Sequence, residues 1–571
     1  LKYGIKALDT IDDDGRYTKH IKKFEGIHIF KADQIVIENL KECKKLLANG
    51  KLTHSYPHSW RSKAPLVHRA TSQWFISMEK KDLRKKALKA IDDTAFYPEK
   101  GRDRIRSMIE TRPDWCISRQ RIWGVPLPLF VSKKTKEPLK DPEVIANIAK
   151  IFEKEGADCW FTDDPQKFLG KKYKKEDYIK SNDIVEVWFD SGATHTYVLE
   201  KRKDLIWPAS MYLEGSDQHR GWFHSSLLES CGTRGRAPFK SILTHGFVVD
   251  GKGLKMSKST GNIISPEDIL KKYGADILRA WVAASDYSED LRLDFSILEQ
   301  HAESYRKIRN TFRFLLGNLK DEKVNFDLNS KEIQKWPEIE RYILHQIYVL
   351  NKNFKKYLKE YNFHKLYKEL LNFCSLDLSA FYFDIRKDVL YCDDLKSPNR
   401  KICINLLGLT LDILLKWFAP ILSFTTEEIF QILNKEKKSS IHLEKLPEIP
   451  QKWENKKIFE KWEKLKIVRN VANAAIEVKR SSKDIGSSLE ADIEVYLDEK
   501  YLKLVKDINL SEFFITSHAK AKSMVNSDKF FKIEGVDDIA VSVKKAEGEK
   551  CSRCWKILGN PCDRCDSVLK N

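Results

Sequence analysis

A lysine- and serine-rich loop framed by glycines, at residues 244–262, limits the folds and functions open to this chain. The segment reads THGFVVDGKGLKMSKSTGN, and Lys255, Ser257 and Lys258 stand at its centre. Glycine lets a loop move and lets backbone approach a ligand closely. Lysine is a compact charge that suits phosphate oxygens, so the loop is predicted to hold a triphosphate while pyrophosphate leaves. The segment is not a GxxxxGKS or GxxxxGKT P-loop, and the alternative interpretation is a solvated basic turn.

Two apolar runs end in polar residues that suit an amino acid or a nucleotide. Residues 185–189 precede Asp-Ser-Gly, and residues 212–213 precede Glu214, Asp217 and Gln218. Both runs read as strands, and residues 216–226 read as a helix. Open α/β sheets bind ligands at the carboxyl ends of their strands, so these side chains and Trp222 are predicted to face one crevice. The two carboxylates suit an ammonium group or ribose hydroxyls, although Asp217 alone also suits a helix N-cap.

The last cysteines form two CxxC pairs separated by seven residues: Cys551, Cys554, Cys562 and Cys565. This spacing predicts one structural zinc ion held by four thiolates, with disulfides as the alternative. Arg553, Lys556 and Arg564 lie between and beside these cysteines, and we expect them to contact RNA phosphate.

Composition narrows the class of protein. The chain has 571 residues and a formal net charge of +19, which favours a polyanionic partner, although lysines spread over all surfaces would give the same charge. Apolar residues make up 42% and charged residues 32%, which predicts a soluble globular chain. Asp412, Lys416 and Pro420 interrupt the most apolar stretch, residues 404–424, which excludes a membrane span there. The other seven cysteines are scattered singly, as is typical of a reduced, cytoplasmic protein.

The second half of the chain has long helical periodicity. Ser265 and Pro266 predict a helix start, and a series of helices is expected from about residue 294. Thr425 and Glu428 are placed as a capping box. Arg306, Arg309 and Arg313 form a basic stripe on one predicted helix, for which a solvated helix face is the alternative. Residues 491–497 alternate as a strand does.

Four segments together carry a family resemblance. They are the KMSKS loop at 255–259, DWCISRQRIWGVPLP at 114–128, EVWFDSGATH at 186–195 and MYLEGSDQHRGWFHSSL at 211–227. In this order they resemble the second half of bacterial-type isoleucyl-tRNA synthetases, which are class I aminoacyl-tRNA synthetases. The resemblance extends over nearly the whole chain. Valyl and leucyl enzymes share the KMSKS loop but differ where this chain reads GSDQHRGWF.

The resemblance implies a multidomain α/β plus α protein with five parts. These are the end of a β-rich editing insertion at 1–110, the second half of a Rossmann-type catalytic domain at 111–293 with a small insertion at 131–185, a helical anticodon-binding domain at 294–455, an α/β junction domain at 456–545 and a zinc-binding module at 546–571. His54, His58 and His68 in the first part are expected to be structural.

The resemblance also implies the reaction and its residues. It implies ATP-dependent ligation of L-isoleucine to tRNA(Ile) through an isoleucyl-adenylate, with editing of valine. Magnesium is expected with ATP because hard divalent cations bridge its phosphates. A monomeric protein is also expected. Lys255 and Lys258 are the expected catalytic residues, and Lys258, Ser257 and Asp217 would bind ATP. The residues expected to bind the isoleucyl-adenylate are Glu214, Gln218, Trp188 and Trp222. Two flat indoles can enclose a branched aliphatic side chain, although such a pocket rejects valine only weakly, a limit for which this enzyme family is a standard example.

One departure from the family pattern bears on activity. Class I enzymes carry an HxGH motif on the first strand–helix turn of the catalytic domain, and this sequence contains none. We therefore expect the sequence to be the C-terminal part of a longer protein, inactive alone, with the editing residues upstream. The alternatives are a valyl- or leucyl-type enzyme and a zinc-bearing tRNA-binding protein without ligase activity.

Overall fold

The computed structural model describes residues 8–59, 62–320, 322–324, 327–434, 439–525, 530–558 and 562–570. The chain divides into two compact units, residues 1–243 and 244–571. The expected zinc-binding module at 546–571 includes residues 559–561 and 571, which lie outside the described residues.

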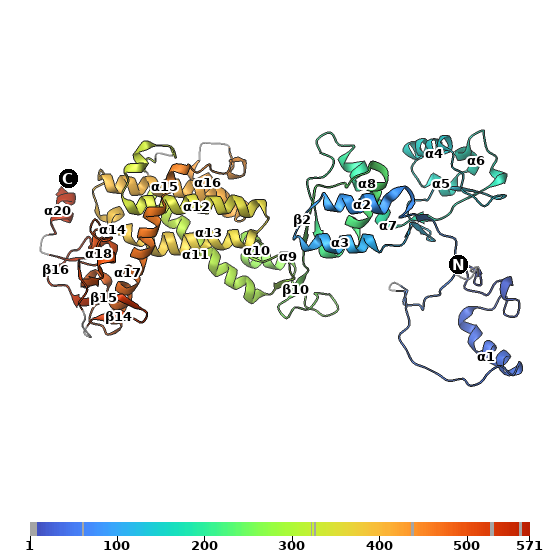
Figure 1. Cartoon of the computed structure of the whole chain (residues 1–571), viewed down its shortest axis with the longest axis horizontal. Coiled ribbons are helices and arrows are strands. Elements are labelled where there is room, and N and C mark those ends of the chain that lie inside the picture. The colour runs from blue at the N-terminus through green and yellow to red at the C-terminus, as the bar shows by residue number, and fades with distance from the viewer. Residues whose placement is uncertain are drawn as a thin grey trace. The chain divides into compact units, whose positions relative to one another are not determined.

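A three-stranded sheet lies at the centre of the first unit. Its order is β2 (Ala95–Tyr97), β9 (Ser241–His245) and β8 (Tyr212–Gly215), and β2 runs parallel to β9. The helices α2 (Leu83–Asp92), α3 (Lys100–Glu110) and α8 (Trp222–Arg234) pack with it around a core that includes Phe96, Phe223 and Leu227 (Figure 1). Because β2 pairs with β9, this sheet crosses the expected domain boundary at residue 110.

The segment before this sheet is not the β-rich region that we expected. Residues 8–59 and 62–74 contain α1 (Ala32–Glu42), the short 3₁₀ helices η1 (Lys19–Ile21) and η2 (Ile29–Lys31), and isolated bridges in place of strands. The first strand, β1 (Phe75–Ile76), pairs antiparallel with β3 (Trp115–Cys116). Most side chains in the described part of this segment are exposed, so little apolar burial is available to stabilise a sheet.

Residues 130–180 fold around a small core of their own. The antiparallel strands β5 (Phe130–Ser132) and β6 (Tyr178–Lys180) flank the helices α4 (Pro142–Glu155), α5 (Cys159–Thr162) and α6 (Pro165–Leu169), with η4 (Lys175–Asp177) before β6. Trp160 and Phe168 are fully buried in this core, 4.9 Å apart between ring centroids. Strands β4 (Ser118–Arg119) and β7 (Ile184–Val185) pair antiparallel on either side of this segment.

Two local predictions near the sheet were wrong. The expected strand over residues 185–189 ends at Val185, and a short helix, α7 (Val187–Gly192), follows it, with the π-turn η5 (His195–Leu199) after that. The expected helix over residues 216–226 is divided into a 3₁₀ turn, η6 (Ser216–His219), and α8. Packing of α7 against α8 overrides the β-type pattern of an apolar run too short to decide its own structure.

The second unit opens with a parallel strand pair joined through two helices. Strand β10 (Val248–Asp250) pairs with β11 (Leu291–Leu293), and α9 (Pro266–Tyr273) and α10 (Ala275–Ala284) connect them. Helix α9 begins as predicted, because the hydroxyl of Ser265 accepts a hydrogen bond from the backbone N–H of Asp268. Ile269, Trp281 and Leu298 form the local core.

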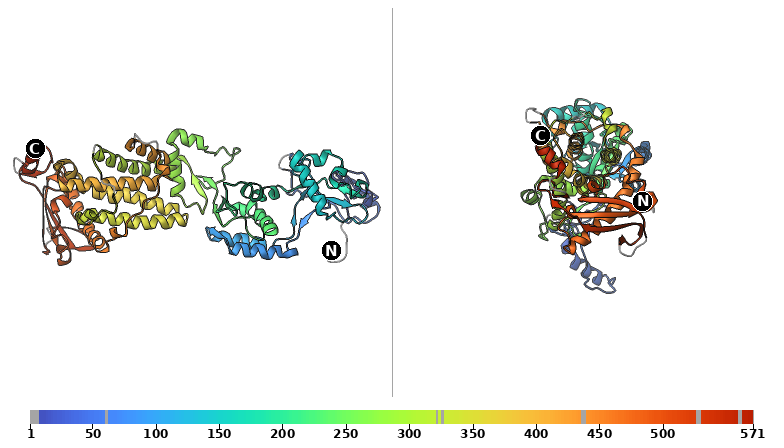
Figure 2. Two further views of the ribbon diagram at one scale, coloured as in Figure 1. Left: turned by 90° about the horizontal axis from the view of Figure 1, so that it is seen from above. Right: turned by 90° about the vertical axis from the view of Figure 1, so that its left-hand side faces the viewer.

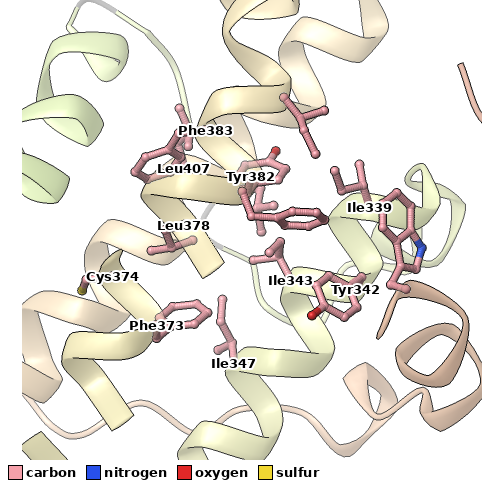
Figure 3. Packing of buried hydrophobic residues seen from close by; sticks show 14 of the residues in the cluster. Ile339, Tyr342, Ile343, Ile347, Phe373, Cys374, Leu378, Tyr382, Phe383 and Leu407 are labelled. Atoms are coloured by element: carbon pink, nitrogen blue, oxygen red, sulfur yellow. The ribbon is translucent and has the colours of Figure 1, made fainter. Parts of the chain in front are cut away.

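A helical bundle follows, as the periodicity predicted. Its helices are α11 (Phe295–Leu319), α12 (Glu338–Lys359), α13 (Phe363–Asn372), η8 (Phe373–Phe383), α14 (Asp384–Cys392), α15 (Pro398–Phe418) and α16 (Ser423–Leu433), with η7 (Lys331–Lys335) before α12. The long helices lie side by side (Figure 2). Figure 3 shows Tyr342 and Ile343 of α12 packed against Leu378 and Tyr382 of η8. Among the described residues, every helix is too short or too polar to cross a membrane.

A mixed four-stranded sheet follows the bundle. Helix α17 (Lys456–Ser481) packs on strands β13 (His518–Ser523), β12 (Ala491–Leu497), β15 (Val536–Lys545) and β14 (Phe531–Ile533), in that order. Strand β12 has the predicted bounds; it is parallel to β13 and antiparallel to β15. After β12 the chain also forms α18 (Glu499–Leu502), α19 (Leu510–Phe513), β16 (Glu549–Lys550), β17 (Ile557–Leu558) and α20 (Asp563–Lys570). Buried Arg386 ties bundle and sheet together through Glu340 and Glu512, 2.7 and 2.5 Å away.

Candidate functional site

The indoles of Trp188 and Trp222, called the indole pair below, both lie where α7 packs on α8 in the first unit. The Nε1–H of Trp222 donates a 2.9 Å hydrogen bond to the carbonyl of Ser191, and its ring stacks on Tyr212 with centroids 4.1 Å apart. The Trp188 ring lies against Gly221, where a Cβ atom would meet it at 3.0 Å. Trp188 remains 41% exposed, so an apolar surface is available to a ligand. The structure thus brings together the two indoles expected to bind the adenylate.

Gln218 lies beside the indole pair, and the two carboxylates extend from the same turn. The Oε1 of Gln218 accepts a 3.0 Å hydrogen bond from the Trp222 backbone N–H, and its Nε2 donates to Asp217 at 3.2 Å. Glu214 at the end of β8 and Asp217 are both exposed. The Asp217 side chain accepts no backbone N–H at the start of η6, so it is not an N-cap. Its carboxylate is therefore available to an ammonium or hydroxyl group.

Helix α8 carries two buried titratable groups, His224 and Glu229, that the sequence did not indicate. Burial, with smaller contributions from Asp190 and Glu186, raises the pKa of Glu229 to about 9. Burial, reinforced by Arg112, lowers the pKa of His224 to about 3. Both side chains are therefore neutral at pH 7. No sequence motif marks Glu229, and only its position seven residues after Trp222 could have directed attention to it.

The lysine-rich loop of the second unit packs on the local core through one apolar side chain, and the two lysines of its KMSKS motif are exposed. Met256 packs on the local core, while Lys255 and Lys258 are exposed and make no ion pair among the described residues. The hydroxyl of Ser257 lies 2.7 Å from that of Thr260. The backbone turns of the loop require a positive φ at Gly253, which glycine adopts without strain. This arrangement suits a loop that offers ammonium groups to phosphate oxygens.

Asn262 and Asp250 anchor this loop, and the sequence analysis assigned neither of them a role. The Nδ2 of Asn262 donates to Asp250 at 2.9 Å, and its Oδ1 accepts from the Ser257 backbone N–H at 2.9 Å. The bond from Asn262 is the largest cause that lowers the pKa of Asp250 below its ordinary value. In the sequence, the asparagine at the end of STGN was the only local sign of this anchor, because a short amide side chain can hydrogen-bond to nearby backbone.

The four terminal cysteines converge as their spacing predicted. Their Sγ atoms all lie within 4.8 Å of one another, and Cys554 and Cys565 are buried. A tetrahedral Zn–S₄ site has Zn–S distances of about 2.3 Å, which places its sulfurs roughly 3.8 Å from one another. The Cys554 and Cys562 sulfurs are 4.0 Å apart. The donor set and its compactness therefore fit zinc.

The basic residues around this cluster do not have the free surface position that we expected for RNA contact. Arg564 forms a bidentate ion pair with Asp388 of α14, at 2.5 and 3.0 Å, and Lys556 lies 3.9 Å from the same carboxylate. Arg553 donates to the Cys392 carbonyl at 2.7 Å. These cations attach the four-cysteine segment to the bundle, because α14 offers Arg564 and Lys556 the partly buried carboxylate of Asp388 and offers Arg553 a backbone carbonyl.

The predicted stripe on α11 divides into paired and free residues. Arg306 forms ion pairs with Glu299 and Glu303 of the same helix. Arg309 donates to the Tyr305 hydroxyl, and Arg313 makes no ion pair among the described residues; both line a cavity of about 710 Å³ beside α16. The stripe therefore offers two arginines to an anion.

Comparison with known proteins places the two units in one family. Residues 17–294 match the model of class I tRNA synthetases for isoleucine, leucine, methionine and valine, and residues 340–496 match the anticodon-binding domain of tRNA ligases. The isoleucine–tRNA ligase of Pelagibacter ubique is 66% identical over 99% of the chain. The chain belongs to the class I aminoacyl-tRNA synthetases. It has a class I catalytic domain and a helical anticodon-binding domain, as the resemblance implied.

Further relatives of this synthetase chain bear the same name. The isoleucine–tRNA ligases of Geobacter sulfurreducens and Caulobacter vibrioides are 44% and 45% identical over 100% and 98% of the chain. The chain spans 61%, 63% and 59% of the lengths of these three relatives. The catalytic match includes both the indole pair and the lysine-rich loop, and the anticodon-binding match extends from α12 to β12.

Proposed function

We propose that this chain supplies part of an isoleucine–tRNA ligase that joins L-isoleucine to tRNA(Ile) with ATP. The observation that carries the proposal is its high identity, over almost its whole length, to curated isoleucine–tRNA ligases. The alternative of a valyl or leucyl enzyme shares the fold but lacks this support.

The residues of the first unit would bind the amino acid. Trp188 and Trp222 would enclose the aliphatic side chain, because flat apolar rings exclude water from a branched chain. Gln218, fixed by the Trp222 backbone, would orient the amino acid. Glu214 would contact the adenylate, and Asp217 would contact ATP, the acceptor-rich carboxylates suiting ammonium or hydroxyl donors.

The loop of the second unit would act on the phosphates. An isoleucine carboxylate oxygen bonds to the α-phosphorus, and the bond to pyrophosphate breaks. Lys258, with Lys255 beside it, would stabilise the negative charge that builds on the departing oxygens, and Ser257 would hydrogen-bond to ATP. The tRNA terminal hydroxyl then takes the acyl group and AMP leaves. No side chain acts as a nucleophile, so positioning and charge stabilisation supply the catalysis. Magnesium would accompany ATP because hard divalent cations bridge phosphate oxygens.

The remaining parts complete the proposal. The four-cysteine site would hold one structural zinc ion, which keeps its thiolates together and closes the segment on α14. Residues 294–455 would bind the anticodon region, 456–545 would form the junction domain, and part of the segment before residue 110 would end an editing insertion. We also propose a cytoplasmic, monomeric protein.

Amino-acid-dependent ATP–pyrophosphate exchange tests the proposal. A chain of the relatives' full length that carries this sequence should exchange with isoleucine in preference to leucine and should charge tRNA(Ile). The 571 residues alone should give no exchange, because the HxGH turn is absent from them. Exchange that prefers leucine, or valine by a wide margin, would assign another amino acid. Retention of tRNA without exchange by any amino acid in the longer chain would support the non-catalytic alternative.

A further inference from the structure

Glu229 shares the contact surface between α7 and α8 with the indole pair, yet it has no part in the proposed reaction. Seven residues separate it from Trp222, so two helical turns place both on one face of α8. Four residues separate Gly192 from Trp188, so one turn places both on one face of α7. The Gly192–Glu229 contact is therefore at one end of the surface and the indole pair at the other.

Three contacts hold the two helices at a fixed spacing. At the first, the Trp188 ring lies against Gly221. At the second, Trp222 donates its 2.9 Å hydrogen bond to Ser191. At the third, the carboxyl group of Glu229 fills the space beside Gly192, where any Cβ atom would collide with Oε1. The backbone of Ser225 lies 3.1 Å from the same Cβ position, so the space is closed from two sides.

The carboxyl group of Glu229 gains little free energy from its surroundings. Its Oε1 is enclosed and has no hydrogen-bond partner among the described residues. An enclosed polar atom without a partner costs free energy, so this position is unfavourable for the carboxyl group itself. Burial and the neighbouring Asp190 and Glu186 favour its neutral form, which also limits repulsion between the helices. The side chain therefore acts mainly through its shape, because it fills the space between α7 and α8.

We propose that Glu229 is a positioning residue that sets the spacing of Trp188 and Trp222, and through that spacing the selectivity between aliphatic amino acids that differ by one methylene. This inference rests on the proposed function. Helix α7 has only six residues, and Phe189 packs on Trp115 with ring centroids 5.7 Å apart. Loss of the Gly192–Glu229 contact removes one of the contacts that set the distance between α7 and α8, so the end of α7 can shift toward α8. A looser indole pair would gain less from the extra methylene of isoleucine than the native pair does.

Exchange kinetics with isoleucine and with valine test this role in a chain of the relatives' full length that carries this sequence. One methylene in an apolar pocket is worth about 10- to 200-fold, a range defined in part with enzymes of this family. Glu229→Ala should lower the isoleucine-to-valine ratio of kcat/KM at least about threefold, mainly through KM for isoleucine. Glu229→Gln keeps the shape and should stay within about twofold of the wild type. Glu229→Asp, which withdraws the carboxyl by one methylene, should fall between them.

The outcomes separate this inference from the proposed function. A wild-type chain without isoleucine-dependent exchange contradicts the proposed function itself. A wild type that exchanges, together with a folded Glu229→Ala variant of unchanged ratio, overturns the spacing role. Equal losses with isoleucine and valine would also overturn it, because a merely structural defect lowers both alike. If Glu229→Ala does not fold, the ratio in Glu229→Asp decides.

Discussion

Lys258 illustrates how a loop can present charge without neutralising it. The loop is closed by Asn262 and Asp250 and not by its lysines, so both ammonium groups stay available to a ligand. An ion pair at rest would have to be broken before phosphate could bind, which would weaken the gain in the transition state.

Lys258→Ala should therefore lower isoleucine-dependent exchange by about 100- to 1000-fold while tRNA binding stays unchanged. The reason is that one preorganised donor to the developing charge is lost, whereas the RNA surface is intact. Lys252→Ala is the matched control, since Lys252 is exposed on the same loop outside the motif. An exchange rate for Lys258→Ala within about twofold of the control would remove Lys258 from this role.

Glu229 makes a prediction about stability that needs no catalysis. The pKa of Glu229 is about 9 in the fold and near 4.5 in the unfolded chain. The free energy of unfolding is therefore highest, as far as Glu229 is concerned, below about pH 4.5, and it falls as pH rises toward 9. Glu229→Gln cannot titrate. The melting temperature of the wild type should therefore fall relative to that of Glu229→Gln between about pH 5 and 9. A constant difference in Tm over this window would show that Glu229 is not held neutral.

At the scale of elements, α10 clamps the break between α15 and α16. Asp276 accepts hydrogen bonds from the backbone N–H and hydroxyl of Thr425, at 2.7 and 2.6 Å, and Arg279 donates to the carbonyls of Pro420 and Ile421. A carboxylate thus meets the start of α16 and a guanidinium meets the end of α15, as their helix dipoles favour. The expected capping box of Thr425 with Glu428 is wrong, because α16 begins at Ser423 and Thr425 donates to Asp276.

Asp276→Ala should lower the free energy of unfolding of the second unit by about 1.5–3 kcal/mol, the usual contribution of hydrogen bonds to a buried charged group. In addition, tRNA charging in the longer chain should fall more than adenylation, because the clamp joins the helices after the lysine-rich loop to the bundle. Urea denaturation and the two assays check this, with exposed Glu267→Ala on α9 as the control. Equal stability of the two variants would contradict the clamp.

The attachment of the four-cysteine segment to α14 is predicted to depend on the proposed zinc ion. Removal of zinc should separate the thiolates and release the Arg564–Asp388 pair, so residues 546–558 and 562–570 should become sensitive to trypsin. Cys562→Ser should reproduce this and lose the one zinc per chain found by metal analysis, whereas Cys43→Ser, at an exposed single cysteine, should not. Reduced protein that contains no zinc would refute the site.

At the scale of the whole molecule, the net charge of +19 should make tRNA affinity steeply dependent on salt. With about six to ten phosphate contacts, affinity should fall by about 10³ to 10⁵ between 50 and 200 mM salt. Arg313→Ala should reduce the slope of log affinity against log salt by about one. Arg306→Ala is the matched control, because its guanidinium is already paired within α11. Equal slopes for both variants would exclude the stripe from the RNA surface.

The sequence by itself determined the family, the convergence of the last four cysteines, the start of α9, the helical bundle and strand β12. These features depend on local patterns: CxxC spacing, a capping serine before proline, helical periodicity and alternation over seven residues. Trp188 and Trp222 were proposed from the family resemblance, although the strand expected to carry Trp188 is a helix.

Only the tertiary structure decided what lies beside these motifs. Arg553, Lys556 and Arg564 contact α14 and do not lie on a free surface. Thr425 donates a hydrogen bond to Asp276. Glu229 is enclosed between α7 and α8. Each outcome depends on a partner far away in the chain or on the removal of water. The free energy of a charged or polar side chain is set by its neighbours and its burial, and no local spacing of residues encodes these.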